Sequence, residues 1–80
     1  MPPSWSARFQ AWTSDLSAMQ SALAVVDTLV RRMPGEPVVH NLQGAVRAAL
    51  GRTEEARSAY QKALDLMPGY TPARLNMARL

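Results

Sequence analysis

Residues 40–69 read HNLQGAVRAALGRTEEARSAYQKALDLMPG, and this stretch indicates the fold because it holds two helical patterns joined by a short turn. In each pattern apolar residues recur three or four positions apart, which is the spacing of one helical face. The first pattern stops at Gly51, and only Arg52 separates that glycine from Thr53, which we expect to cap the second helix. A turn this short forces two helices to pack antiparallel. The stretch therefore predicts a helical hairpin.

The end of the stretch is the second copy of a tripeptide. Met67-Pro68-Gly69 repeats Met33-Pro34-Gly35, so that equivalent residues stand 34 positions apart. Each copy closes a helical pattern, because proline interrupts a helix and glycine accepts the turn that ends it. We therefore expect two equivalent corners of a repeat.

The same spacing rule predicts five helices and no strand across the whole chain. A polar segment from Thr13 to Ser17 separates the first two, and Pro37 and Pro72 stand where a first-turn proline opens a helix. The expected helices cover residues 4–14, 17–33, 37–50, 53–67 and 71–80. This order predicts an all-α fold, a solenoid (α-α superhelix) of antiparallel helix pairs within one domain of 80 residues.

The composition excludes several classes of protein. With 48% hydrophobic and 19% charged residues, the chain is an ordinary globular sequence rather than a disordered one. It has no cysteine, which excludes disulfide scaffolds, thiolate metal sites and thiol catalysis. The net charge of +3 is small for a nucleic-acid binder. No stretch has the length of a membrane span or the form of a signal peptide, and we expect a cytoplasmic protein.

Helical hairpins at a 34-residue period resemble the tetratricopeptide repeat (TPR) family, whose pattern is W-x2-L-G-x2-Y, then A-x3-F, then A and P. The middle of the chain matches this pattern at its small, aromatic and proline positions, which are Gly44, Ala56, Tyr60, Ala63 and Pro68. Gly44 and Ala56 allow the two helices to approach closely, and Tyr60 fills the space beside them. The sequence departs from the pattern where tryptophan, leucine and tyrosine are replaced by His40, Gln43 and Arg47.

The resemblance divides the chain into three parts. Residues 37–70 form the best-matching repeat. Residues 3–36 form a degenerate repeat in which Ala22 and Pro34 keep their motif positions, and residues 71–80 are the first helix of a truncated repeat.

The resemblance implies a non-enzymatic module for protein–protein interaction, with no cofactor. In such solenoids the first helices line a concave groove that holds a peptide or a partner's helix. The groove residues expected here are Asn41, Ala45, Ala48, Asn76 and Arg79. The alanines leave room for a ligand backbone, Asn76 can donate to it and accept from it, and Arg79 can pair with an acidic group.

The sequence leaves other partners and contexts open. The repeat sequence also resembles helical regions that precede sulfotransferase or oxygenase domains. The chain can therefore be the N-terminal TPR region of a larger bacterial enzyme, where it would serve recruitment or dimerisation. Nucleic acid and membrane are not expected as partners. The last expected helix leaves Leu75, Met77 and Ala78 uncovered, with Tyr60, Leu64 and Met67 partly open, which predicts a homodimer through this C-terminal edge.

Two further features have competing interpretations. His40 is the only histidine and has no carboxylate cluster at ligand spacing, so we expect a half-buried structural histidine rather than a metal ligand or catalytic base. Trp5, Phe9 and Trp12 share one helical face. They either fill the core of the first repeat or remain exposed as a protein-binding or dimer patch, because tryptophan is favoured at interfaces.

Overall fold

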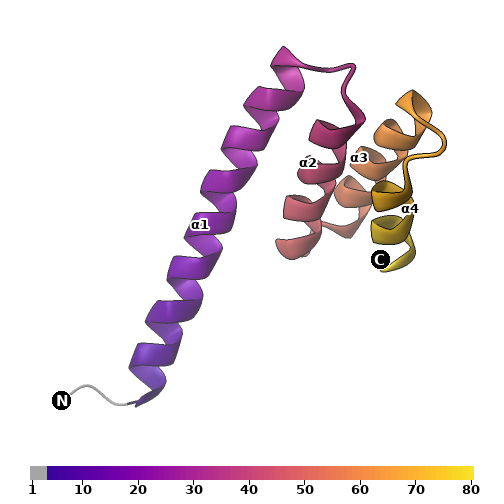
Figure 1. Ribbon diagram of the computed structural model, residues 1–80. Helices are drawn as coiled ribbons and strands as arrows, with labels where there is room; N and C mark the ends of the chain where they lie inside the picture. Colours follow the sequence, from indigo (N-terminus) through magenta and orange to yellow (C-terminus); the bar gives the residue numbers. More distant parts are fainter. Residues whose placement is uncertain (1–3) are drawn as a thin grey trace.

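The computed structural model describes the backbone of residues 4–80 and the side chains of residues 16–80. Its elements are four α-helices: α1 (Ser4–Arg32), α2 (Pro37–Ala49), α3 (Thr53–Leu66) and α4 (Thr71–Ala78) (Figure 1). The described residues contain no strand. The predicted all-α, helical-repeat fold is confirmed.

The first two predicted helices, 4–14 and 17–33, form the single helix α1, so the predicted boundary between them is wrong. The turn of the second hairpin explains why. That turn uses Gly51 at a φ of +79°, and 34 positions earlier the residue is Ser17. Left-handed backbone costs a residue with a Cβ about 1–2 kcal/mol. The segment from Thr13 to Ser17 has no glycine or proline, and the helix therefore continues through it.

The α2–α3 hairpin forms as predicted, with the two helices side by side (Figure 1). Gly44 lies against the ring of Tyr60, and a Cβ at Gly44 would come within 2.5 Å of a ring carbon. Only glycine permits this approach. The expected Thr53 cap is wrong, because Thr53 is the first residue of α3 and no side chain caps this end of the helix.

The core lies where α3 meets α2 and α4. Its buried cluster consists of Ala56, Tyr60, Ala63 and Ala73, and partly buried apolar side chains surround it, among them Ala48, Leu64, Met77 and Leu80. Alanines at these positions let the helices approach so closely that one aromatic ring fills the remaining space. Tyr60 is 2% exposed. The expectation that it is partly open is wrong, because α4 packs against the cluster.

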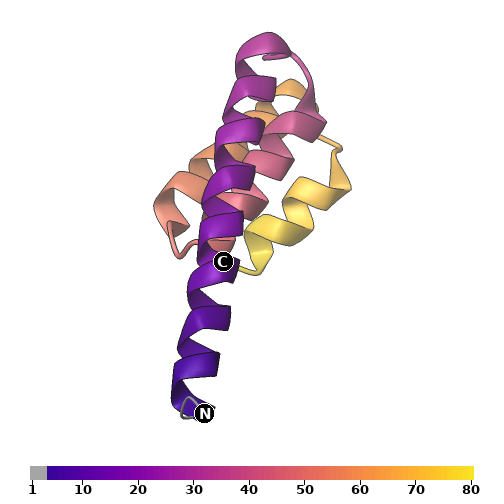
Figure 2. The same cartoon turned by 90° about the vertical axis from the view of Figure 1, so that its left-hand side faces the viewer.

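α1 is arranged differently from the other helices. Among the described residues it contacts α2 and no other helix, and it does so with its C-terminal half, where Leu23 and Val26 are buried. The N-terminal half projects beyond the other three helices (Figures 1 and 2). Within the described part of the chain, no helix combines the length and apolar character needed to cross a bilayer.

Candidate functional site

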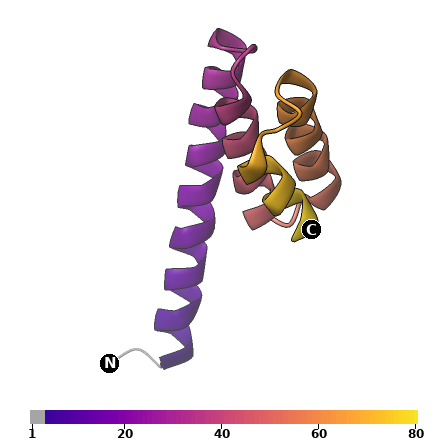
Figure 3. The ribbon, with the colours of Figure 1, turned by 45° about the vertical axis from the view of Figure 1, so that its right-hand side comes forward.

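Four of the predicted groove residues lie on α2 and α4, which are in contact (Figure 3), and the fifth, Arg79, follows the end of α4. Asn41 and Asn76 meet across this contact, where the Asn76 side-chain NH2 donates to the Asn41 Oδ1 at 3.0 Å. Both side chains are half-buried. The bond uses one amide atom of each residue, so that the Asn41 NH2 and the Asn76 carbonyl can still meet a ligand.

The other three predicted groove residues differ in exposure. Ala45 and Arg79 are exposed, and Arg79 follows directly after the end of α4. Ala48 is half-buried and packs against the Ala56–Tyr60 cluster, so it supports the core. The structure thus brings Asn41 and Asn76 together and leaves Ala45 accessible on α2 and Arg79 accessible just after α4.

Sequence reasoning missed an apolar stripe on the solvent side of α2. Val38 is 48% and Leu42 is 43% exposed, and the exposed Ala45 and Ala49 continue the same 4–3–4 spacing. Leu42 and Val39 stand three positions apart, the spacing of one helical face, but Val39 is buried and Leu42 is exposed. Leu42 lies outside the inner face of α2. This face is defined by the buried residues of the helix, which are Val39, His40, Gln43 and Gly44.

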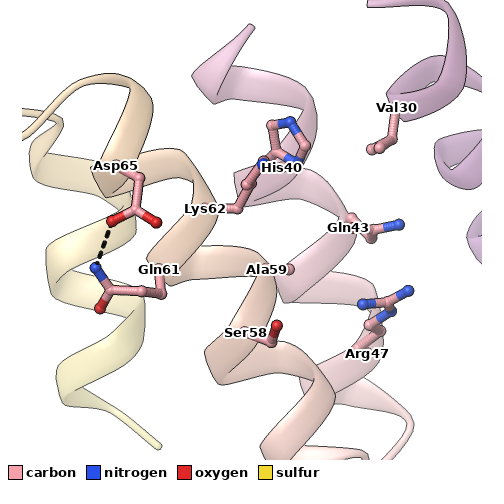
Figure 4. A pocket seen from close by; sticks show the side chains of 9 residues that line it. All are labelled: Val30, His40, Gln43, Arg47, Ser58, Ala59, Gln61, Lys62 and Asp65. Atoms are coloured by element: carbon pink, nitrogen blue, oxygen red, sulfur yellow. Dashed lines mark hydrogen bonds between the residues drawn. The ribbon is translucent and has the colours of Figure 1, made fainter. Parts of the chain in front are cut away.

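A hollow lies on another side of α2, between α1 and α3. It has a volume of about 390 Å³ and is lined by side chains from all three helices (Figure 4). α2 contributes His40, Gln43 and Arg47, which are the three residues that depart from the repeat pattern. Polar side chains therefore stand where the pattern has large apolar ones.

Each of these three residues has a polar partner. The His40 Nε2–H donates to the carbonyl oxygen of Pro34 at 2.7 Å, which ties α2 to the corner after α1. Gln43 donates its Nε2–H to Asp27 Oδ1 at 2.7 Å. Arg47 lies 3.9 Å from the same Asp27 carboxylate and 4.0 Å from Glu55. The α1–α2 interface is thus held partly by a polar network.

The α3 side of the hollow carries mixed charge. Lys62 and Asp65 line it, and Asp65 accepts a hydrogen bond from Gln61 at 2.9 Å. His40 is 4% exposed, so it is more deeply buried than expected, and its ring has a structural partner in Pro34. Among residues 16–80 no three acidic or histidine side chains gather closely enough to hold a metal ion. The polar and charged side chains that line the hollow can bond to polar groups of a ligand.

Two alternative interpretations from the sequence concern side chains before residue 16, which the structure does not describe. These are the two interpretations of Trp5, Phe9 and Trp12, which remain predictions. The backbone of these residues belongs to α1.

Comparison with known proteins identifies the repeat. The sequence model of the family described as tetratricopeptide repeat matches residues 37–70, which span α2, α3 and the corner before α4. No curated protein and no solved structure matches the chain. The predicted resemblance is confirmed for this segment.

Proposed function

Residues 37–70 of this chain are a tetratricopeptide repeat, and on this basis we propose that the chain is a non-enzymatic module that binds a peptide or a partner's helix along α2 and α4. Tetratricopeptide repeats in general mediate protein–protein interactions. The observation that carries the proposal is the Asn41–Asn76 pair, which joins the two helices and has one donor group and one acceptor left for a ligand backbone.

The apolar stripe on α2 supports the same surface. Val38, Leu42 and Ala45 lie exposed beside the asparagine pair, and exposed apolar side chains rimmed by polar groups are typical of interaction sites. Arg79 is exposed at the end of α4, where its guanidinium can make paired hydrogen bonds to a carboxylate. The proposed ligand is therefore an extended or helical segment with apolar residues and at least one acidic side chain.

A peptide array tests this proposal. Decapeptides that combine leucine with aspartate or glutamate are compared with the same peptides carrying asparagine or glutamine. We expect binding to the acidic set, a loss with Arg79→Glu, and a weaker signal with Asn76→Ala. Arg57→Glu is the matched control, because Arg57 is exposed on α3, where it pairs with Glu54. The proposal would be contradicted if the acidic peptides and their amide counterparts bound equally. It would also be contradicted if Arg57→Glu reduced peptide binding as much as Arg79→Glu.

A second copy bound at the C-terminal edge remains an alternative occupant. Leu75 is 54% exposed there, while Met77 and Leu80 are half-buried against the core cluster. Met77→Lys combined with Leu80→Lys should weaken such a dimer. The cytoplasmic location and the role as part of a larger bacterial enzyme also remain proposals, and the length of the native open reading frame decides the latter.

A further inference from the structure

The C-terminal half of α1 packs on α2, and the backbone of its N-terminal half projects beyond α2 (Figures 1 and 2). In the sequence of α1 an apolar stripe runs through both halves. In the C-terminal half the stripe consists of Leu23, Val26 and Val30, of which the first two are buried. Counting toward the N-terminus by alternating four and three positions gives an uninterrupted series of large apolar residues: Met19, Leu16, Trp12, Phe9 and Trp5.

This alternation repeats every seven residues from position 5 to position 30, which is the spacing of a helix that pairs along a seam with another helix. α2 is only 13 residues long, and Leu23 and Val26 in the C-terminal part of the seam are buried where α1 contacts it. The backbone of α1 is helical back to Ser4. Residues 5–16 continue this sequence pattern where the backbone of α1 projects beyond α2, α3 and α4, so the pattern predicts a further partner helix there (Figure 1).

We propose that the partner is a second copy of the chain, with residues 5–16 of the two copies paired as an antiparallel coiled coil. The seam is self-complementary in one register, which opposes Phe9 to Trp12 of the second copy and Trp5 to Leu16 of the second copy. A two-fold axis then produces each of these pairs twice.

The charges that flank the seam select this register. Arg8 and Asp15 stand immediately before the seam residues Phe9 and Leu16, which are the positions that face each other across an antiparallel pair. In the proposed register Arg8 of each copy stands opposite Asp15 of the other. A shift by one heptad opposes Asp15 to Asp15 of the second copy, and a parallel pair opposes these charges only to Thr13 and Gln20. Among these three arrangements, only the proposed antiparallel register places Arg8 of one copy opposite Asp15 of the other.

Sedimentation velocity between about 1 µM and 1 mM measures the association. We expect a monomer–dimer equilibrium that Phe9→Asp abolishes. Circular dichroism of this variant should keep the signal of the α2–α3–α4 core. Arg8→Glu and Asp15→Arg should each raise the dissociation constant about tenfold, because each change replaces two opposite-charge pairs by two like-charge pairs.

The two charge variants mixed together provide the sharpest comparison. In the mixed dimer the two substituted side chains face each other with opposite charges, and so do the unchanged Arg8 and Asp15. The mixture should therefore associate as tightly as the original chain. Arg31→Glu, which changes the net charge as Arg8→Glu does but lies outside residues 5–16, should leave the dissociation constant unchanged. A monomer at all concentrations, a mixture no tighter than its components, or a dimer lost only with Met77→Lys and Leu80→Lys would overturn the proposal.

Discussion

Ala22 in α1 and Ala56 in α3 stand 34 positions apart in the same place of the repeat, but their surroundings differ. Ala56 is fully buried and Ala22 is exposed. Val25 and Ala59 show the same contrast, since Val25 is 62% exposed and Ala59 is 4% exposed. α3 has α2 on one side and α4 on another, while α1 has α2 alone among the described helices.

The difference shows how a helical repeat depends on its turn. In the second repeat the chain reverses at Gly51, and α2 then covers the alanine face of α3. In the first segment Ser17 occupies the equivalent position and the chain does not reverse. The alanine face of α1 therefore remains open, although its sequence still carries the motif alanine.

The largest expected effect distinguishes the two alanines directly. Ala56→Leu should lower the free energy of unfolding by about 1–3 kcal/mol, because the added volume has no space among α2, α3 and α4. Ala22→Leu makes the same chemical change on an exposed face and should alter stability by no more than about 0.5 kcal/mol. Urea unfolding of both variants measures the contrast, and equal effects would mean that the two faces are covered alike.

A second variant tests the close approach that only the complete hairpin has. Gly44→Ala should destabilise the chain by about 1–2 kcal/mol, since the new methyl group meets the ring of Tyr60. Tyr60→Leu removes the ring, and in that background the same glycine change should cost much less. Additive effects in the urea unfolding of the four chains would show that Gly44 and Tyr60 do not meet.

The third pair of variants places the larger effect in α1 instead of α3. Asp27 lies in the α1–α2 interface and accepts a hydrogen bond from the buried Gln43, whereas its equivalent in α3, Gln61, is exposed. Asp27→Ala should cost about 1 kcal/mol because the Gln43 amide loses its partner. Gln61→Ala should change stability only slightly. A larger loss for Gln61→Ala in thermal unfolding would contradict the packing of α1 on α2.

The smallest expected effect is a pH dependence. Burial raises the pKa of Tyr60 above its ordinary value of 10.0, because the phenolate is poorly solvated in the core. The folded chain keeps this proton to a higher pH than the unfolded chain. The contribution of Tyr60 to the free energy of unfolding is therefore fully present below pH 10. It is lost as the pH rises above 10, because the unfolded chain then releases this proton more readily. Tyr60→Phe should make this decrease shallower, and an identical alkaline profile would place the ring in water.

The hairpin could be predicted from sequence because its signals are local. Gly51 supplies the turn, Pro37 the start of α2, and the 34-residue spacing of the two corners gives the register of Gly44 and Tyr60. The continuity of α1 could not be recognised from polarity alone, because serine and threonine are tolerated in a helix when no glycine offers an alternative.

The candidate site was only partly predictable, because its contacts join distant parts of the chain. Asn41 and Asn76 were both expected on one surface, but their hydrogen bond depends on how α4 packs against α2. Arg31 stands four positions after Asp27, which is the spacing of a surface ion pair, but Asp27 accepts a hydrogen bond from Gln43. Its bond to Gln43 spans 16 positions, and nothing in the local pattern around either residue indicates it.

The contrast between the two repeats depends above all on the continuity of α1, which a distance measurement can check. The chain has no cysteine, so spin labels can be attached at Ala7→Cys and Arg31→Cys without removing any residue of that type. Labelled chain diluted into excess unlabelled chain avoids distances between copies. A continuous helix places the two backbone positions about 36 Å apart, at ~1.5 Å per residue. Pulsed electron–electron double resonance should give a distribution of distances between the two spin labels that is centred near this value. A centre below about 20 Å would show that residues 4–14 fold back to complete the first repeat, and α1 would then not be one helix.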